Sequence, residues 1–200
     1  MGMCLALHSV SDKNIEKILN QPELIWQLIA PDDPEIYQDA IQQIQQPGFL
    51  ARLFGKKPPA PVEPQQLNLA EGEGVEDDLD KSWHGIHFCL NKTDYDAQPP
   101  MDFITVGGLS AGDIDVGYGP ARLFHHDTVK TIHQHLSEIS TEGLQANYDP
   151  QKMDELDIYP NIWKRDSDEG FEYIADYFDN LKTFVEKCVK NKLGMAVYLC

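Results

Sequence analysis

The stretch FEYIADYFDNLKTFVEKCVKNKLGMAVYLC, residues 171–200, decides the fold of this 200-residue chain. Its apolar side chains first recur every three or four positions: Phe171, Ile174, Ala175, Phe178, Leu181, Val185, Cys188 and Val189. This period predicts an amphipathic helix from about Ser167 to Leu193 that buries one continuous face. Gly194 ends the helix, and MAVYLC, residues 195–200, follows as a short strand.

The opposite end of the sequence also predicts a strand. Residues 3–9, MCLALHS, alternate two sets of side chains that are both mostly apolar, as in a strand covered on both faces. We expect this strand to lie beside the C-terminal one in a central sheet. With 200 residues and 42% hydrophobic side chains, the chain is predicted to fold as a single α+β or α/β domain over residues 1–200.

Helices are predicted after the first strand. Ser11 precedes a helical pattern as an N-cap, Pro22 can begin a second helix, and a third is predicted over about 34–46. The short amphipathic stretch FLARLFGKK, residues 49–57, is interpreted as a segment that docks onto the domain. The segment at about 56–78 is rich in proline and then in acidic residues, which favours an exposed surface excursion.

The middle of the chain predicts two further extended segments and a helix. Residues 101–109 are typical of a strand that ends at a Gly-Gly turn, and residues 117–124 of another extended segment. A helix follows that is capped within residues 126–128 and has apolar residues at three- and four-residue spacing up to Ile139.

The charge of the chain restricts the partners that it can bind. Sixteen Lys and Arg residues stand against thirty-three Asp and Glu residues, so the formal net charge is −17. This charge repels nucleic-acid phosphates and anionic membrane surfaces, and no apolar run approaches the ~20 residues of a membrane span. We therefore expect no nucleic-acid and no membrane binding. The same charge would speed the encounter with a basic protein partner or would simply keep the chain soluble; solubility is the commoner role, and the charge alone does not decide between them.

The cysteines and the start of the sequence indicate the cell compartment. Cys4, Cys89, Cys188 and Cys200 show no CxxC or other metal-ligand spacing, so reduced thiols are expected. The first residues lack the basic and then apolar pattern of a leader peptide. We expect a cytoplasmic protein, and no motif predicts a metal or another cofactor.

The first candidate site is the segment DLDKSWHGIHFCL, residues 78–90. It predicts a largely buried helix that starts near Lys81, with Asp80 as the N-cap. His84 and His87 lie three residues apart and could reach one metal ion or one substrate, but the HExxH spacing and its glutamate are missing. A hydrogen-bonded structural role is the favoured interpretation for at least one of these histidines.

The second candidate site is DVGYGPARLF, residues 115–124. It lacks the Walker lysine and the GxGxxG glycines, so it does not resemble a phosphate-binding loop. Arg122 is the only arginine between Arg52 and Arg165, in a segment of small and apolar residues. A half-buried arginine needs partners, so an internal ion pair is the first interpretation and an anion-holding role the second.

Several motifs together resemble one known family. They are MGM at the start, LDKSWHGIHFCL, VGYGPARLF, IYPNIW and the aromatic C-terminal helix, and they resemble the YfbM-like family of bacterial proteins of unknown function. The resemblance covers nearly the whole chain. It implies a compact, single-domain α/β protein of a bacterial cytoplasm, and it implies no reaction and no catalytic residue.

The absence of a catalytic signature favours a non-enzymatic function. The leading hypothesis is an acidic interaction module, of the inhibitor or immunity type, that covers a basic partner. The sequence leaves open whether the protein is an enzyme.

The alternative is a small-molecule-binding domain or enzyme with a cleft between the DKSWHG and GYGPAR segments. In that cleft Asp80, His84 and His87 would be acid/base groups and Arg122 an anion clamp. Other candidate ligand-site residues are Lys81, Trp83, Tyr118, Tyr159 and Trp163. We expect the histidines and Arg122 to be enclosed rather than open to solvent.

Overall fold

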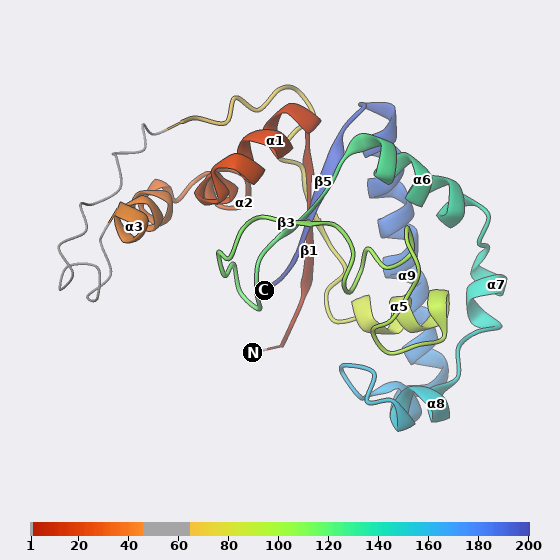
Figure 1. The fold of residues 1–200 in the computed structure, drawn as a ribbon. Coiled ribbons are helices and arrows are strands. Elements are labelled where there is room, and N and C mark those ends of the chain that lie inside the picture. The colour runs from red at the N-terminus through yellow and green to blue at the C-terminus, as the bar shows by residue number, and fades with distance from the viewer. Residues whose placement is uncertain (1, 46–64) are drawn as a thin grey trace.

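A five-stranded antiparallel sheet forms the centre of the protein, in a computed structural model that describes residues 2–45 and 65–200. The strands are β1 (Leu5–Val10), β2 (Glu76–Asp78), β3 (Leu109–Ser110), β4 (Arg122–Phe124) and β5 (Gly194–Leu199). Their spatial order is β2-β1-β5-β4-β3, and each neighbouring pair is antiparallel. The two strands predicted at the ends of the sequence therefore pair with each other (Figure 1).

The β1–β5 pair is buried on both faces. Leu7 lies opposite Val197, and both side chains pack into the larger core, which α9 lines. Ala6 lies opposite Tyr198, and both pack into the second core under α1 and α2. This arrangement explains why both sets of alternating side chains in these strands are apolar.

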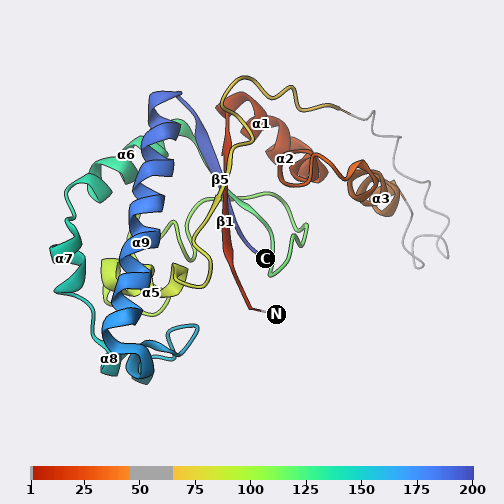
Figure 2. The same ribbon diagram turned by 180° about the vertical axis from the view of Figure 1, so that it is seen from behind.

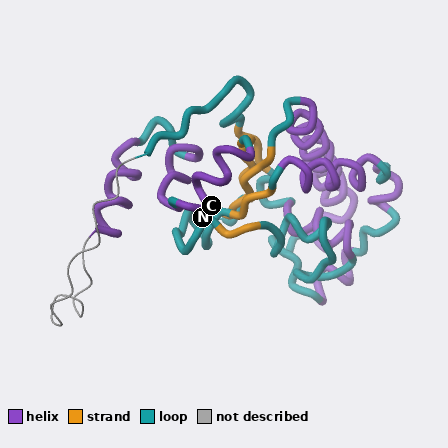
Figure 3. The backbone as a smooth tube through the Cα atoms, turned by 45° about the horizontal axis from the view of Figure 1, so that its top comes forward, coloured by secondary structure: helices purple, strands orange, loops and turns teal. Residues whose placement is uncertain are grey.

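Two layers of helices cover the sheet (Figures 1 and 2). One face carries α1 (Asp12–Asn20), a 3-10 turn (Pro22–Leu24), α2 (Ile25–Ile29) and α3 (Pro34–Gln45). The other face carries α5 (Trp83–Asn91), α6 (His126–Ser137) and α9 (Trp163–Lys190), with the short helices α7 (Thr141–Gln145) and α8 (Pro150–Glu155). Figure 3 shows the strands between these two groups of helices. The fold is α+β in one domain.

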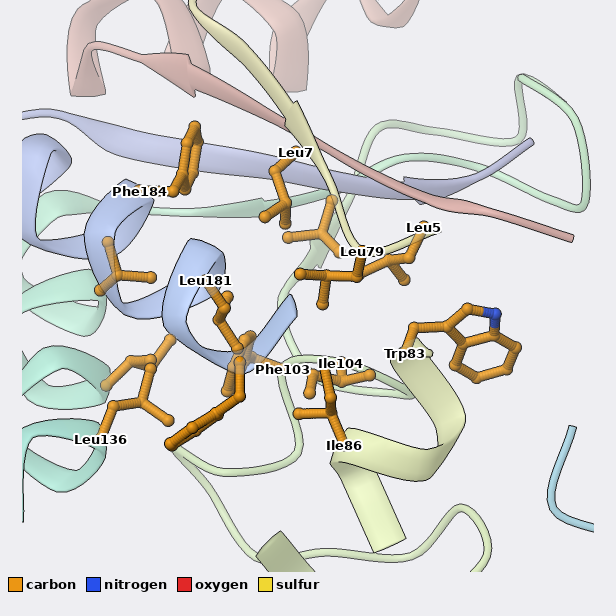
Figure 4. Close-up of a cluster of buried hydrophobic side chains, with 14 of the residues drawn as sticks. Leu5, Leu7, Leu79, Trp83, Ile86, Phe103, Ile104, Leu136, Leu181 and Phe184 are labelled. Carbon is orange, nitrogen blue, oxygen red and sulfur yellow. The ribbon is translucent and has the colours of Figure 1, made fainter. Parts of the chain in front are cut away.

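The predicted apolar stripe of α9 forms much of the larger core. Phe178, Leu181 and Phe184 are 0%, 0% and 2% exposed. Leu181 and Phe184 belong to the same buried cluster as Leu5 and Leu7 of β1, and Figure 4 shows Phe184 beside Leu7. No helix in the described ranges, 2–45 and 65–200, is both long and apolar enough to cross a membrane.

Two sequence predictions of local structure are corrected, and the start of one helix is refined. Residues 101–109 are not a strand: residues 101–106 form turns, and only β3 is extended. The extended segment predicted at 117–124 is limited to β4, because a glycine loop occupies 117–119. Helix α9 extends from Trp163 to Lys190, but the backbone at Ser167 is non-helical, with a φ of 42°, so the long helix predicted from about Ser167 is preceded by one additional turn.

The proline-rich and acidic segment is described only in part. The stretch at 49–57 lies outside the described residues, as does the first half of the excursion predicted at 56–78. Residues 65–70 are irregular, and the segment then reaches β2, which pairs with β1. The sequence pattern does not predict β2, because its three residues are all acidic and have no apolar alternation.

Candidate functional site

His84 is enclosed and uses both ring nitrogens. His84 is 1% exposed, and its ring stacks on the Trp83 ring with 4.8 Å between the ring centroids. The Tyr159 backbone N–H donates to Nδ1 at 3.0 Å, so the proton lies on Nε2, which donates to the Asp94 carbonyl at 2.7 Å. In this neutral tautomer His84 connects α5 to two loops by hydrogen bonds. This is the structural role that the sequence favours for at least one of the two histidines.

His87 is enclosed as well and is held neutral. It is 0% exposed, and its ring nitrogens face the side chains of Asn91, Thr93 and Thr105 at 3.3 to 3.5 Å. Burial, with the nearby His84, lowers the pKa of His87 to about 4. In the described part of the chain no group of three or more His, Cys, Asp or Glu side chains could hold a metal ion.

Arg122 is bound by backbone carbonyls. Its guanidinium donates to the Phe103 and Gly107 carbonyls at 2.8 and 2.9 Å and to the Ile104 carbonyl at 2.7 Å. The turn that supplies these acceptors is closed by the Asp102 carbonyl, which accepts the backbone N–H groups of three following residues. The predicted internal ion pair is therefore wrong: the partners are carbonyls, and the turn around the guanidinium replaces the predicted strand.

Arg122 remains charged inside this carbonyl cage, which we define by the carbonyls of Phe103, Ile104 and Gly107. Burial lowers its pKa to about 10, and the charge of Asp102 opposes that effect. A guanidinium provides several donors in one plane, so one side chain can satisfy three carbonyls of the turn. The sequence signal, a lone arginine among small and apolar residues, correctly indicates a residue with specific partners.

We expect Arg122→Lys to lower the free energy of unfolding by about 2 kcal/mol, because an ammonium cannot reproduce the planar fork and leaves buried carbonyls unpaired. Urea denaturation measures the change. Arg165→Lys is the matched control, since Arg165 is exposed and is expected to cost less than about 0.5 kcal/mol. Equal unfolding midpoints for the Arg122 variant and the native protein would contradict the structural importance of the cage.

Asp80 does not cap α5, in contrast to the prediction. Ser82 is the N-cap residue, and its side chain makes no capping hydrogen bond. The Asp80 carboxylate instead accepts from Tyr173 Oη at 2.7 Å and from Cys4 Sγ at 3.2 Å. Burial raises the pKa of Asp80, but these hydrogen bonds and the charge of Lys81 outweigh it, so the pKa lies below its usual range.

Asp80 and Lys81 line an open hollow of about 470 Å³ beside the first turns of α9. A hollow of this size is large enough for a small ligand or for one or two side chains of a partner. The other lining residues are Pro160, Ile162, Asp166, Glu169, Gly170 and Tyr173. None of these six is among the candidate ligand-site residues, although Pro160 and Ile162 belong to the motif IYPNIW and the acidic run in the first half of α9 is visible in the sequence.

The remaining predicted site residues are not brought together in one cleft. Trp83 and Trp163 are each 1% exposed, and their indole N–H groups donate to the Met3 and Ile158 carbonyls. Tyr159 Oη accepts from the Met3 N–H at 2.8 Å. Tyr118 is 53% exposed on the glycine loop. The buried histidines and the turn that binds Arg122 are adjacent, since Thr105 of that turn contacts His87 Nδ1 at 3.4 Å, whereas Tyr118 lies on the exposed loop.

These features define a single-domain α+β protein whose sheet joins its terminal strands and whose central histidines are part of the core. The chain belongs to the family described as domain of unknown function, DUF1877, whose model matches residues 1–198. This match, together with the solved structure of YfbM described next, confirms the resemblance to the YfbM-like family.

The solved structures that match include one with the same fold over nearly its whole length. It is YfbM from Escherichia coli, a protein of unknown function, with 13% sequence identity and a TM-score of 0.60, and the match covers 98% of this chain and 99% of that one. Comparison with curated proteins gives no significant match. The structural likeness shows the fold and leaves the function to be inferred from the site.

Proposed function

We propose that the protein is a non-enzymatic binding module that recognises a basic protein partner through an acidic surface on β2 and α9. The observation that carries the proposal is the meeting of two acidic runs. Six acidic residues lie between Glu71 and Asp80, and six more, with no Lys or Arg, lie between Asp166 and Leu181. The hydrogen bond from Tyr173 to Asp80 joins these two runs across 93 residues of sequence.

We define the acidic face by five exposed carboxylates of these two elements: Glu76, Asp78, Glu169, Glu172 and Asp176. Tyr173 and Tyr177 lie among them, with their rings in edge-to-face contact at 5.2 Å. Burial and the neighbouring carboxylates raise the pKa of Tyr177, so its hydroxyl stays neutral. Two tyrosines surrounded by negatively charged carboxylates suit a partner whose basic side chains can pair with the carboxylates and pack on the tyrosine rings.

The enclosure of the histidines and of Arg122 supports binding over catalysis. His84 and His87 are almost completely buried, and Arg122 is committed to the carbonyl cage. A general base must come within hydrogen-bond reach of its substrate. The two histidines are therefore part of the protein core and Arg122 is fully engaged by carbonyls in this conformation, whereas the carboxylates of the acidic face are accessible.

The test is affinity capture with a charge-reversed variant, Glu172→Lys/Asp176→Lys. Asp32→Lys/Glu138→Lys, at exposed sites outside the acidic face, changes the net charge by the same amount and is the matched control. We expect the native protein and the control to retain the same basic protein at low salt. The face variant should retain at least about tenfold less, and high salt should release the partner from all three.

Equal retention by the face variant and the control would contradict the proposed surface. Failure of the native protein to retain any basic protein at either salt concentration would contradict the proposed class of partner. The small-molecule alternative would gain support if, in that case, a metabolite raised the melting temperature of the native protein and if Glu169→Lys, in the hollow lining, abolished the shift.

A further inference from the structure

Cys4 and Cys200 lie directly opposite each other at one end of the β1–β5 ladder. The Cys4 N–H donates to the Cys200 carbonyl at 2.8 Å, and the Cys200 N–H donates to the Cys4 carbonyl at 2.9 Å. This exchange of both hydrogen bonds extends the register set by Leu5 and Leu199 by one residue. In such a pair the Cα atoms are about 5.5 Å apart, and both side chains point to the same face of the sheet.

We propose that Cys4 and Cys200 form a reversible disulfide, so that this end of the sheet is a site of thiol oxidation. The expected Cα separation lies in the range of protein disulfides. Cys200 is exposed and its Sγ is 3.7 Å from the Cys4 carbonyl oxygen, so a soluble oxidant can reach the pair. Cys89 and Cys188 are buried and belong to the larger core.

The geometry also makes this disulfide easy to reduce. Directly opposite residues in a hydrogen-bonded pair have Cβ atoms about 1 Å farther apart than a relaxed disulfide requires. The strand ends must therefore shift slightly when the bond forms. A strained and accessible disulfide has a high reduction potential and belongs to the labile class.

Oxidation takes place by two exchanges with a low-molecular-weight disulfide such as oxidised glutathione. The Cys200 thiolate attacks one sulfur of the oxidant, which releases one glutathione thiolate and leaves a mixed disulfide. The Cys4 thiolate then attacks the Cys200 sulfur and releases the second glutathione thiolate. The protein loses two electrons and two protons, and the oxidant becomes two glutathione thiols.

The surroundings of Cys4 make this reaction slow at neutral pH. Burial, with the hydrogen bond to Asp80, raises the pKa of Cys4 to about 11, and burial raises the pKa of Cys200. Only the thiolate reacts, so the rate should rise with pH throughout the neutral and mildly alkaline range. Disulfide formation also removes the Cys4 S–H that donates to Asp80.

The test is treatment of the reduced full-length protein with oxidised glutathione, followed by mass measurement without reductant. We expect the native protein to lose the mass of two hydrogen atoms. Peptide analysis should find a cross-linked pair that contains Cys4 and Cys200, and dithiothreitol should reverse the change fully. The linked form should also melt at a higher temperature than the reduced form. Cys188→Ala should behave in the same way, whereas Cys200→Ser should not form the bond.

Three results would overturn the proposal: only glutathione adducts on Cys200, only dimers linked through Cys200, or no change in mass. Cys200→Ser changes an exposed residue and is expected to fold, so the test does not depend on the stability of a Cys4 variant. The disulfide does not require the acidic face, and its test is therefore independent of partner binding.

Discussion

Phe178→Asp is expected to leave the protein insoluble. Phe178 is 0% exposed and belongs to the larger core between α9 and the sheet. The substitution removes about 3–5 kcal/mol of packing and places an unpaired carboxylate in an apolar site, which adds several kcal/mol more. Their sum approaches or exceeds the total stability of a typical domain, about 5–15 kcal/mol. The soluble fraction after expression is the measurement.

A milder substitution at the same position should leave the protein folded, so that its free energy of unfolding can be measured. Phe178→Leu should fold and should lower the free energy of unfolding by about 1–2 kcal/mol in urea denaturation. Asn180→Asp is the control for the added charge, because Asn180 is exposed on the same helix. A soluble Phe178→Asp protein with native stability would show that this face of α9 does not contribute to the core.

Acidification below pH 6.5 is expected to destabilise the protein through its buried histidines. Above about pH 6.5 the imidazoles are neutral in both the folded and the unfolded chain. Burial lowers the pKa of His8 and His84, and it lowers the pKa of His87 to about 4. Between pH 6.5 and 4 the unfolded chain binds protons that the folded protein does not bind, so stability falls as pH falls.

The contribution of His87 to this loss is expected to be about 3 kcal/mol between pH 6.5 and 4, given the size of its pKa shift. Urea denaturation at a series of pH values measures it. The slope of the unfolding free energy against pH gives the number of protons that the unfolded chain binds in excess of the folded protein. His87→Gln should lower this number by up to one, whereas His135→Gln, at an exposed position on α6, should leave it unchanged. Parallel pH profiles for the native protein and His87→Gln would show that the His87 ring is not held neutral by burial.

The sequence predicts this fold most reliably where hydrophobic periodicity is long and uninterrupted. The stripe from Phe171 to Cys188 and the two terminal strands extend over many residues, so their pattern identifies both the elements and the faces that they bury. Ser11 is also a correct prediction, since its side chain accepts the Asn14 N–H as an N-cap. Residues 101–106 have the apolar, β-branched composition of a strand, but they form turns whose carbonyls accept hydrogen bonds from the Arg122 guanidinium.

The candidate site is predicted less well, because the spacing of residues in the sequence does not show which distant residues are in contact in the structure. Residues 80–87 predict a group of polar side chains, and the burial of His84 and His87 agrees with the structural interpretation. The hydrogen bond between Asp80 and Tyr173 depends on how α9 crosses the sheet, which no local pattern specifies. The charge pattern of the sequence shows both acidic runs, but it does not show that they are neighbours in the structure.

The pairing of β1 with β5 has a consequence for the order of folding on the ribosome. The register joins Leu5 to Leu199, so β1 and the central strand β5 meet only after residues 194–199 have been synthesised. Until then β1 has two apolar faces and no central partner, and contacts between such distant residues are slow to form. Nascent chains stalled before residue 194 are therefore expected to bind chaperones and to resist native folding, whatever the state of their helices.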